Sequence, residues 1–503
     1  MIAMSEHPKA DWERFGRARK AEAESITELN GWRRNPRSFD VASYYGQVLI
    51  HRAHTVMLEE QGIITTEEAR RILEGVRAVK KAAAGDPSLV GYMSTETALI
   101  KQVGEVGGKM HIGRSRNDMG HAQRRIYFRD QTERLIGAVI EFQRLLIEKA
   151  EENIETLMPG YTHIRQAQPV TLAHYILAHV EAATRTVERL EGVYARANLS
   201  TMGAAALAGT SWGVDRERLR ELLGFDGLCE NSTDAVATID YVIELASAIA
   251  IHMTQIGRLA EDLQIWSSDE YNMIDIDEAY AGTSSIMPQK KNPLEFEYIK
   301  SYSAESIGNL VSTVASIKGV TYTNTVDRIL LEPVALDTAV GSTNVMAGAV
   351  TTLTPKKDVM LKNLRNGFTT ATDLADTLVR NHGLSFRQAH DIIVEVVVKA
   401  LEEGKSAVEI GPEMVADASE KVIEKKLRVS TEELASALDL NKNLLGRNTV
   451  GGPAPESVKK MIANRRKSVE DQVKRHRARL DRVKEAEKKL DEAEKRTNPG
   501  THF

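Results

Sequence analysis

The sequence predicts an all-α protein, and three observations support this fold class. Aromatic residues make up only 5% of the 503 residues, and long segments are rich in Ala, Leu, Glu, Lys and Arg. Apolar residues recur in these segments at the three- and four-residue spacing of a helix face. Strand-like alternation is scarce. Several central segments are apolar around much of their circumference, so we expect a helical bundle that also buries surface between subunits.

Five amphipathic segments predict the main helices. Residues 63–82 open with a capping box formed by Thr65 and Glu68, which satisfies the first free N–H groups of a helix. The apolar face of this segment consists of Ile72, Leu73 and Val76. The other four predicted helices cover residues 132–157, 172–198, 233–266 and 300–319. The longest apolar run lies in the third of these, but Asp240 and Glu244 interrupt it, so a buried helix is expected rather than a membrane span.

Composition and motif searches exclude several classes of protein. The net charge of -5 argues against a nucleic-acid partner. Cys229 is the only cysteine, so no internal disulfide or cysteine metal cluster is expected, and a reducing, cytoplasmic location fits. The N-terminus lacks the apolar segment of a signal peptide.

No cofactor or metal motif stands out in the sequence. GEVGGK, residues 104–109, lacks the spacing of a phosphate-binding Walker loop, and no GxGxxG follows a strand. Two histidine pairs lack an obvious carboxylate companion and are interpreted as packing or surface histidines: His51 with His54, and His174 with His179. We therefore expect no metal and no cofactor.

We divide the chain where the helical pattern is interrupted, near residues 118 and 365. This gives an N-terminal helical domain over 1–118, a central bundle over 119–364 and a C-terminal helical domain over 365–503. Residues 465–496 form one highly charged segment with a rough heptad of Val and Leu. This segment predicts a solvated helix with a single packed stripe.

Two polar loops are candidates for ligand binding. KMHIGRSRNDM, residues 109–119, is either a charged surface turn or an anion clamp, because guanidinium, hydroxyl and amide groups match the acceptors of a carboxylate. MPGYTHIRQAQPVT, residues 158–171, places Thr162 and His163 ahead of a helix. A histidine beside a hydroxyl is a possible proton carrier near neutral pH, and a structural turn is the alternative.

A third loop, AGTSSIMPQKKNPLEFE, spans residues 281–297 and looks too irregular for a helix or a strand. Ser284, Lys290 and Asn292 have the ingredients for removing a proton next to a carboxylate. The resulting carbanion is stable enough to form only if its charge is delocalised onto the carboxylate oxygens, and if cations and hydrogen-bond donors contact those oxygens. Nearby positive charge and backbone N–H groups favour a serine alkoxide. A serine is an unusual base, so the chemistry permits this role without demanding it.

Together these loops resemble the fumarase/aspartase superfamily and, within it, the argininosuccinate lyase family. The resemblance runs from about residue 38 to about residue 465. Its motifs stand in the family's order: GGKMHIGRSRND, GYTHIRQAQPVTLAHY, LAGTSWGVDRERLRELLGFDGLCENSTDAV, RLAEDLQIWSS, SSIMPQKKNP and ATDLADTLVRNHGLSFRQAHDI. The resemblance implies a three-domain, mostly α-helical subunit whose central long helices form the twenty-helix core of a homotetramer. It also implies active sites built from loops of three subunits.

The resemblance further implies a cofactor-free β-elimination that releases fumarate from an N-substituted aspartate. The matching catalytic positions are Ser284 as base, Lys290 and Asn292 at the carboxylate bearing the carbanion charge, and Thr162 and His163 for carboxylate binding and proton delivery to the leaving nitrogen. The matching substrate-binding positions are Ser115, Arg116, Asn117, Gln168, Ser285 and Met287.

The sequence departs from the family in the part of the site that holds arginine. In segment 319–333, Tyr322 is displaced, and the family's Gln and Lys positions fall near Ile329 and Leu331. Other family residues are replaced as well: Ile239 stands for an Arg, Gln47 and His51 for an Asp and a Ser, and Thr283 for a Gly. Lost polar partners cost roughly 1–3 kcal/mol each, so we expect poor binding of an arginine half.

These departures favour a different N-substituted aspartate as substrate. An offshoot of the family that cleaves ethylenediamine-N,N′-disuccinate to N-(2-aminoethyl)aspartate and then a diamine is the best match. Arg328 and His51 are candidate cations for the extra carboxylates. The alternatives are argininosuccinate cleavage, adenylosuccinate cleavage and a non-catalytic, crystallin-like protein. The sequence leaves open the leaving amine, the physiological direction, whether loop 281–297 is open or closed, and the role of helix 465–496.

Overall fold

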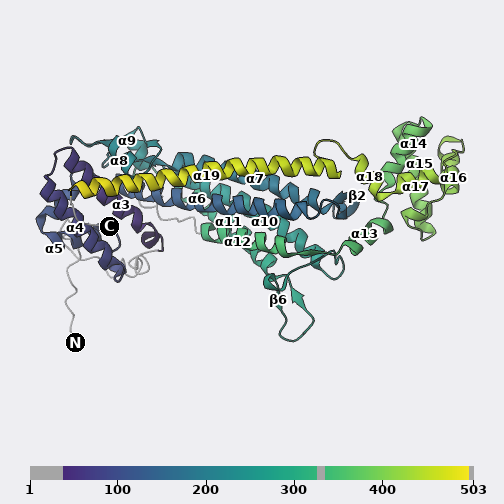
Figure 1. The fold of residues 1–503 in the computed structure, drawn as a ribbon, viewed down its shortest axis with the longest axis horizontal. Helices are drawn as coiled ribbons and strands as arrows, with labels where there is room; N and C mark the ends of the chain where they lie inside the picture. The colour runs from purple at the N-terminus through teal and green to yellow at the C-terminus, as the bar shows by residue number, and fades with distance from the viewer. Residues whose placement is uncertain (1–37, 326–334, 498–503) are drawn as a thin grey trace.

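The computed structural model describes residues 38–325 and 335–497, and the predicted all-α class is confirmed. The described chain is elongated, with a small helical group at each end of a long central bundle (Figure 1). Each of the three parts has its own apolar cluster of buried side chains. No helix in the described ranges is long and apolar enough to cross a membrane.

The N-terminal group contains α3 (Ser38–Glu60), α4 (Thr66–Ala83) and α5 (Tyr92–Val103), followed by the 3-10 helix η3 (Glu105–His111). The predicted capping box at the start of α4 is confirmed: the Thr65 side chain accepts the N–H of Glu68, and the Glu68 carboxylate accepts the N–H of Thr65. The predicted apolar face of α4 is buried in the N-terminal cluster. Its residues are Ile72, Leu73 and Val76.

The central bundle is built from long helices packed side by side. They are α6 (Arg116–Glu151), α7 (Leu172–Ala197), α10 (Asp240–Ser267), α11 (Leu294–Ile317) and α12 (Ala335–Thr352). The prediction placed the start of the first helix at residue 132, but α6 begins at Arg116, because Ser115 and Asp118 form a second capping box. The predicted helix over 233–266 is divided into α9 (Ser232–Ala237) and α10, with a break at Thr238 and Ile239.

Short strands appear where only loops or helix ends were expected. The strands form four separate pairs in the described chain: β1 (Leu157–Thr162) with β2 (Arg165–Thr171), β3 (Leu199–Ser200) with β4 (Gly227–Leu228), β5 (Ile274–Asp275) with β8 (Thr354–Pro355), and β6 (Gly282–Thr283) with β7 (Lys291–Asn292). The end of the predicted helix over 132–157 is therefore wrong: α6 stops at Glu151 and the chain enters β1.

The C-terminal group is a set of short helices with its own apolar cluster. It contains α13 (Lys357–Asn366), α14 (Ala371–His382), α15 (Phe386–Glu402), α16 (Pro412–Ile423), α17 (Thr431–Leu438) and α18 (Leu440–Gly446). A further short helix, α8 (Arg216–Leu222), packs near the N-terminal group. The three-domain division predicted from the sequence stays a prediction, although the apolar clusters follow it in outline.

The last helix, α19 (Pro455–Thr497), begins before the predicted residue 465 and runs back along α6 and α7 to the N-terminal group (Figure 1). Val469 joins the central apolar cluster, and Leu490 joins the N-terminal one. Of the predicted heptad, Leu480 is exposed, so the packed stripe is not continuous. The helix is therefore a strap along the central bundle and is not confined to the C-terminal group.

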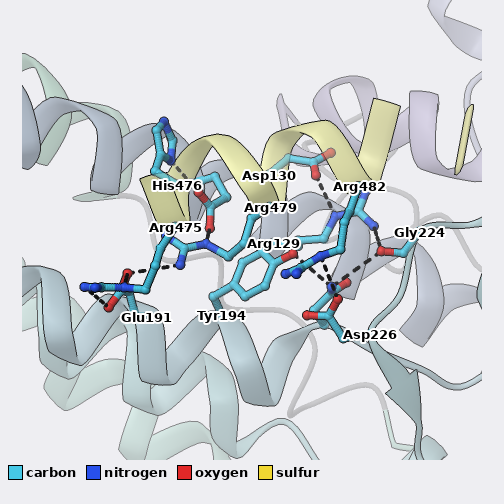
Figure 2. Close-up of polar contacts among 12 residues, drawn as sticks. Arg129, Asp130, Glu191, Tyr194, Gly224, Asp226, Arg475, His476, Arg479 and Arg482 are labelled. Carbon is cyan, nitrogen blue, oxygen red and sulfur yellow. Dashed lines mark hydrogen bonds and ion pairs between the residues drawn. The ribbon is translucent and has the colours of Figure 1, made fainter. Parts of the chain in front are cut away.

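Ion pairs complete the packed face of α19. Arg475 and Arg479 both donate to the Glu191 carboxylate on α7, at 2.9 Å and 3.0 Å for the nearest pairs of atoms (Figure 2). Arg479 also donates to Glu133 on α6, whose carboxylate is buried and contacts His476. Arginine has a planar fork of donors, so one side chain can bridge two carboxylates on different helices.

Candidate active site

The first candidate segment is the start of helix α6, not a free loop. The Ser115 hydroxyl accepts the N–H of Asn117 at 3.2 Å, and the Asp118 carboxylate accepts the N–H of Ser115 at 2.9 Å. The predicted loop over 109–119 therefore consists of the end of η3, a turn and the first turn of α6. Arg116 is exposed and Asn117 half-buried, so both side chains can reach a ligand above the helix start.

Asp118 holds a second segment against this helix start. Its buried carboxylate accepts the N–H groups of Gly203 and Ala205, at 3.1 Å and 2.9 Å. Burial raises the pKa of Asp118 to about 6, while the backbone N–H groups act in the opposite direction. The Asn117 amide next to it donates to the Ala206 carbonyl at 3.0 Å. The sequence shows Asp118 only as a member of a polar motif. Its function of holding the backbone around Gly203 could not be predicted, because Gly203 lies more than eighty residues away.

The segment that departs most from the family lies beside Asn117. The Asn324 amide donates to the side-chain oxygen of Asn117 at 2.6 Å. The Tyr322 hydroxyl donates to the Asp234 carboxylate on α9. The buried Ile239 caps α10, which starts just after α9. The altered positions 239 and 322 thus both lie next to α9, whereas Arg328, Ile329 and Leu331 lie outside the described residues.

Thr162 and His163 lie ahead of helix α7, as predicted, but in a β-hairpin that the sequence did not indicate. β1 and β2 pair in antiparallel fashion, and α7 begins only at Leu172. His163 and Ile164 have φ values of 53° and 59°, the left-handed conformation that a two-residue hairpin turn requires. Thr162, His163 and Ile164 are all exposed at the tip. Gln168 lies further along β2, where it lines a cleft of about 780 Å³ against α14, α17 and α18.

Loop 281–297 is a hairpin that projects from the central bundle (Figure 1). The expectation that it lacks regular structure is wrong at its base, because Gly282 pairs with Asn292 and Thr283 with Lys291. A side chain at Gly282 would place Cβ 2.2 Å from Leu294, so only glycine fits there. The expectation is also wrong at the end of the loop, because residues 294–297 form the first turn of α11, which follows Pro293.

Ser284 is held at the start of this hairpin loop. Its Oγ accepts the N–H groups of Ile286 and Met287, at 3.3 Å and 3.0 Å. Two N–H donors at one hydroxyl oxygen favour its deprotonated form, as a serine base requires. The loop residues Ser285, Met287 and Lys290 are exposed, and Ile286 is 78% exposed.

The two lysines of the loop differ in their contacts. Lys291 donates to the Ile276 carbonyl at 2.6 Å and pairs with Asp275 at 2.8 Å, so it tethers the hairpin. The Lys290 side chain is exposed at the loop end and can reach a ligand. The sequence alone does not distinguish the two adjacent lysines. Their contacts in the structure show that Lys291 anchors the hairpin, whereas Lys290 is free to reach a ligand.

One chain does not bring the three candidate segments together. Ser115 precedes the first residue of α6, and the hairpin with Thr162 and His163 follows its last turn. A helix of 36 residues is about 54 Å long, at 1.5 Å per residue. That length exceeds any small substrate, so the helix start and the hairpin of one chain cannot contact the same molecule. The hairpin with Ser284 projects at a third place along the chain (Figure 1).

Comparison with known proteins places this arrangement in a class. A family model described as lyase matches residues 46–308, just over half of the chain, and one described as argininosuccinate lyase C-terminal matches residues 368–444. The protein is therefore a lyase. More specifically, the chain belongs to the argininosuccinate lyase family of the fumarase/aspartase superfamily, and it is a carbon–nitrogen lyase.

Relatives at about 40% identity include argininosuccinate lyases and EDDS lyase. The argininosuccinate lyase of Methanocaldococcus jannaschii is 39% identical over 469 residues, covering 91% of this chain and 93% of that protein. The argininosuccinate lyase of Methanosarcina mazei is 40% identical over 437 residues, covering 85% and 88%. A crystal structure of EDDS lyase in complex with formate matches with a TM-score of 0.90 and 39% identity, covering 97% of this chain and 98% of that chain.

Proposed function

We propose that the enzyme releases fumarate from an N-substituted aspartate by reversible β-elimination, with ethylenediamine-N,N′-disuccinate as its substrate. The observation that carries this choice is the position of the altered segment. Asn324 contacts Asn117 in the first turn of α6, where Asn117 would hold the substrate, and Tyr322 contacts Asp234 on the neighbouring helix α9. The residues expected to handle fumarate are all present, so we assign the departures at Ile239 and Tyr322 to the amine half.

The reaction follows from the candidate residues. Ser284 removes a proton from Cβ of the succinyl group, and the electron pair moves onto the adjacent carboxylate, where Lys290 and Asn292 meet the charge. The C–N bond then breaks, and the electron pair that returns forms the double bond of fumarate. His163 delivers a proton to the leaving nitrogen, while Thr162 holds a carboxylate. Every step uses side chains of the protein.

In a homotetramer with shared sites, the three candidate segments come together from different subunits. Three segments that one chain keeps apart can meet when different subunits each contribute one. Helix α11 supports such assembly, because large apolar side chains that a lone subunit leaves in water are exposed on more than one side of it. These side chains are Tyr298, Tyr302, Ile307, Val311 and Val314.

Argininosuccinate is the second candidate substrate. It is favoured by the argininosuccinate lyases of methanogenic archaea, which are 37–40% identical to this chain over most of its length. Both candidates share the aspartate half, so the fumarate-handling residues do not distinguish them. The amine half decides the outcome.

Parallel fumarate-release assays on the two substrates test the proposal. Purified enzyme is mixed with ethylenediamine-N,N′-disuccinate or argininosuccinate, and fumarate is followed by its ultraviolet absorbance. We expect release from the disuccinate and little or none from argininosuccinate. Rapid release from argininosuccinate alone would overturn the choice of substrate but not the class of reaction. The Ser284→Ala variant serves as the control for enzyme-independent release.

A further inference from the structure

Arg114 is a buried cation with no hydrogen-bond partner among the described residues. It immediately precedes the cap of α6, and all three guanidinium nitrogens lack a hydrogen-bond acceptor among the described residues. Arg129 on α6 is equally buried but pairs with Asp130 at 2.7 Å and donates to the Leu223 carbonyl at 2.9 Å (Figure 2). A buried, unpaired charge is strongly unfavourable, so Arg114 requires an explanation that Arg129 does not.

The groups around Arg114 leave its charge without a direct counter-ion. His51 and His54 are fully buried beside it, and each has an Nδ1 atom with no partner in the described part of the chain. Burial and the charge of Arg114 lower the pKa of both histidines, so both are neutral near pH 7. The carboxylate of Glu96 lies 3.6 Å from His111, and that of Asp118 is taken up by backbone N–H groups.

Arg114 and the histidines around it, His51, His54 and His111, lie next to the candidate substrate site. Arg114 is followed directly by Ser115, Arg116 and Asn117 in the sequence. His111, which feels the charge of Arg114, has a side chain that is 40% exposed. A fork of five N–H donors with a neutral imidazole beside it is matched by the oxygens of a carboxylate. A neutral amine has no such acceptors and would leave the guanidinium unpaired.

We propose that Arg114 and His51 bind a carboxylate carried by the amine half of the substrate. The inference rests on the proposed function and narrows it, because the leaving amine must itself carry a carboxylate. Ethylenediamine-N,N′-disuccinate meets this requirement, since its leaving amine is N-(2-aminoethyl)aspartate. The second elimination does not, since its leaving amine is ethylenediamine. The enzyme therefore favours the first elimination over the second by about tenfold or more.

Two arginine variants provide the test. The ratio of kcat/KM for the disuccinate to that for N-(2-aminoethyl)aspartate is measured in wild type, Arg114→Met and the matched control Arg129→Met. We expect Arg114→Met to bring the ratio close to one while Arg129→Met keeps the wild-type ratio. Thermal unfolding without ligand separates this role from a structural one. Arg114→Met should keep or raise the melting temperature, whereas Arg129→Met should lower it.

Ligand-induced thermal shifts distinguish failure of this inference from failure of the proposed function. The disuccinate should raise the melting temperature of wild type, and this shift should be lost in Arg114→Met, even if neither compound is turned over. Fumarate, which lacks an amine half, should give the same shift in both proteins. A wild-type ratio near one, or an Arg114→Met variant that keeps both the ratio and the disuccinate shift, would overturn the subsite.

Discussion

Ser284 is the residue on which the proposed chemistry depends, and its geometry suits the role. Replacement of Ser284 by Ala removes the proton acceptor but leaves the backbone N–H groups of the loop in place. We expect kcat to fall by about 10²-fold or more with the assembly unchanged. Fumarate release and size-exclusion chromatography measure the two effects. Ser268→Ala, which removes a hydroxyl bonded within its own turn, is the control. Near-normal turnover in Ser284→Ala would disprove the assignment.

His252 makes the stability of the bundle sensitive to acid. It lies on α10, is fully buried, and its Nε2 is 2.8 Å from the Thr343 hydroxyl on α12. Burial lowers its pKa from 6.5 to about 4. Below pH 6.5 the unfolded chain binds a proton that the folded chain excludes, so stability falls as the pH drops towards 4. One such group contributes about 3 kcal/mol in total.

The His252→Gln variant tests this contribution, because glutamine keeps a polar contact to Thr343 but does not titrate. We expect the unfolding midpoint of the variant to fall less than that of wild type between pH 7 and pH 4.5. The comparison is made by thermal unfolding monitored by circular dichroism across that range. Parallel curves for the two proteins would show that His252 is not a source of the acid sensitivity.

At the residue scale, the sequence supplied the types of side chain but not their contacts. The motifs were enough to single out Ser284, and the expected roles of the site residues stay predictions. Lys291 differs from Lys290 because it contacts Ile276, fifteen positions earlier in the sequence. That Arg114 lacks a hydrogen-bond partner depends on how distant segments pack around it. No local pattern carries that information.

Among the secondary-structure elements, helix α19 depends on a buried ion pair. Glu133 on α6 is buried between Arg479 and His476 of α19. Glu133→Gln would leave the Arg479 charge buried with Glu191 as its remaining carboxylate partner. Breaking a buried pair in this way costs about 3–5 kcal/mol. We expect a clear drop in melting temperature.

An exposed pair on the same helix provides the control for Glu133→Gln. Arg466 contacts Glu151 with both side chains about half exposed. Arg466→Gln should change the free energy of unfolding by no more than about 1 kcal/mol, because water screens the pair. Both variants are measured by chemical denaturation. Equal changes in the free energy of unfolding would show that the buried Glu133 contact stabilises the protein no more than the exposed pair does.

Element boundaries were predictable where the signal is local and failed elsewhere. The capping box at Thr65 lies ahead of a clear amphipathic run and was found. The one at Ser115 was missed, because the same residues were interpreted as a ligand-binding loop. The hairpin around His163 was missed as well, since its strands are short and contain Pro159 and Pro169.

On the scale of the whole molecule, shared active sites have a direct test. The Ser284→Ala and His163→Asn variants should each be inactive alone. Mixed by subunit exchange, they should recover about a quarter of wild-type activity, since each of the two residues comes from an intact chain about half the time. Fumarate release is measured after native mass spectrometry has verified the exchange. No recovery would mean that both residues of a site come from the same chain.

The homotetramer stays a prediction, and residue patterns alone could not specify it further. Helices that are apolar all round indicated extra partners, and the exposed apolar side chains around α11 are consistent with that expectation. The sequence does not fix which faces meet, because apolar contacts are non-directional. The length of α6 is what separates the predicted site residues of one chain, and that length requires knowing where the helix begins and ends.

The path of α19 has a consequence for synthesis of the chain. Arg52 on α3 pairs with Glu494, and Leu490 fills the apolar cluster of the N-terminal group. The two members of that pair are 442 positions apart. At typical translation rates, roughly 20 to 90 seconds pass between their incorporation. The apolar cluster of the N-terminal group therefore cannot be completed until α19 has been synthesised. A polypeptide released before that point lacks the side chains that fill this cluster.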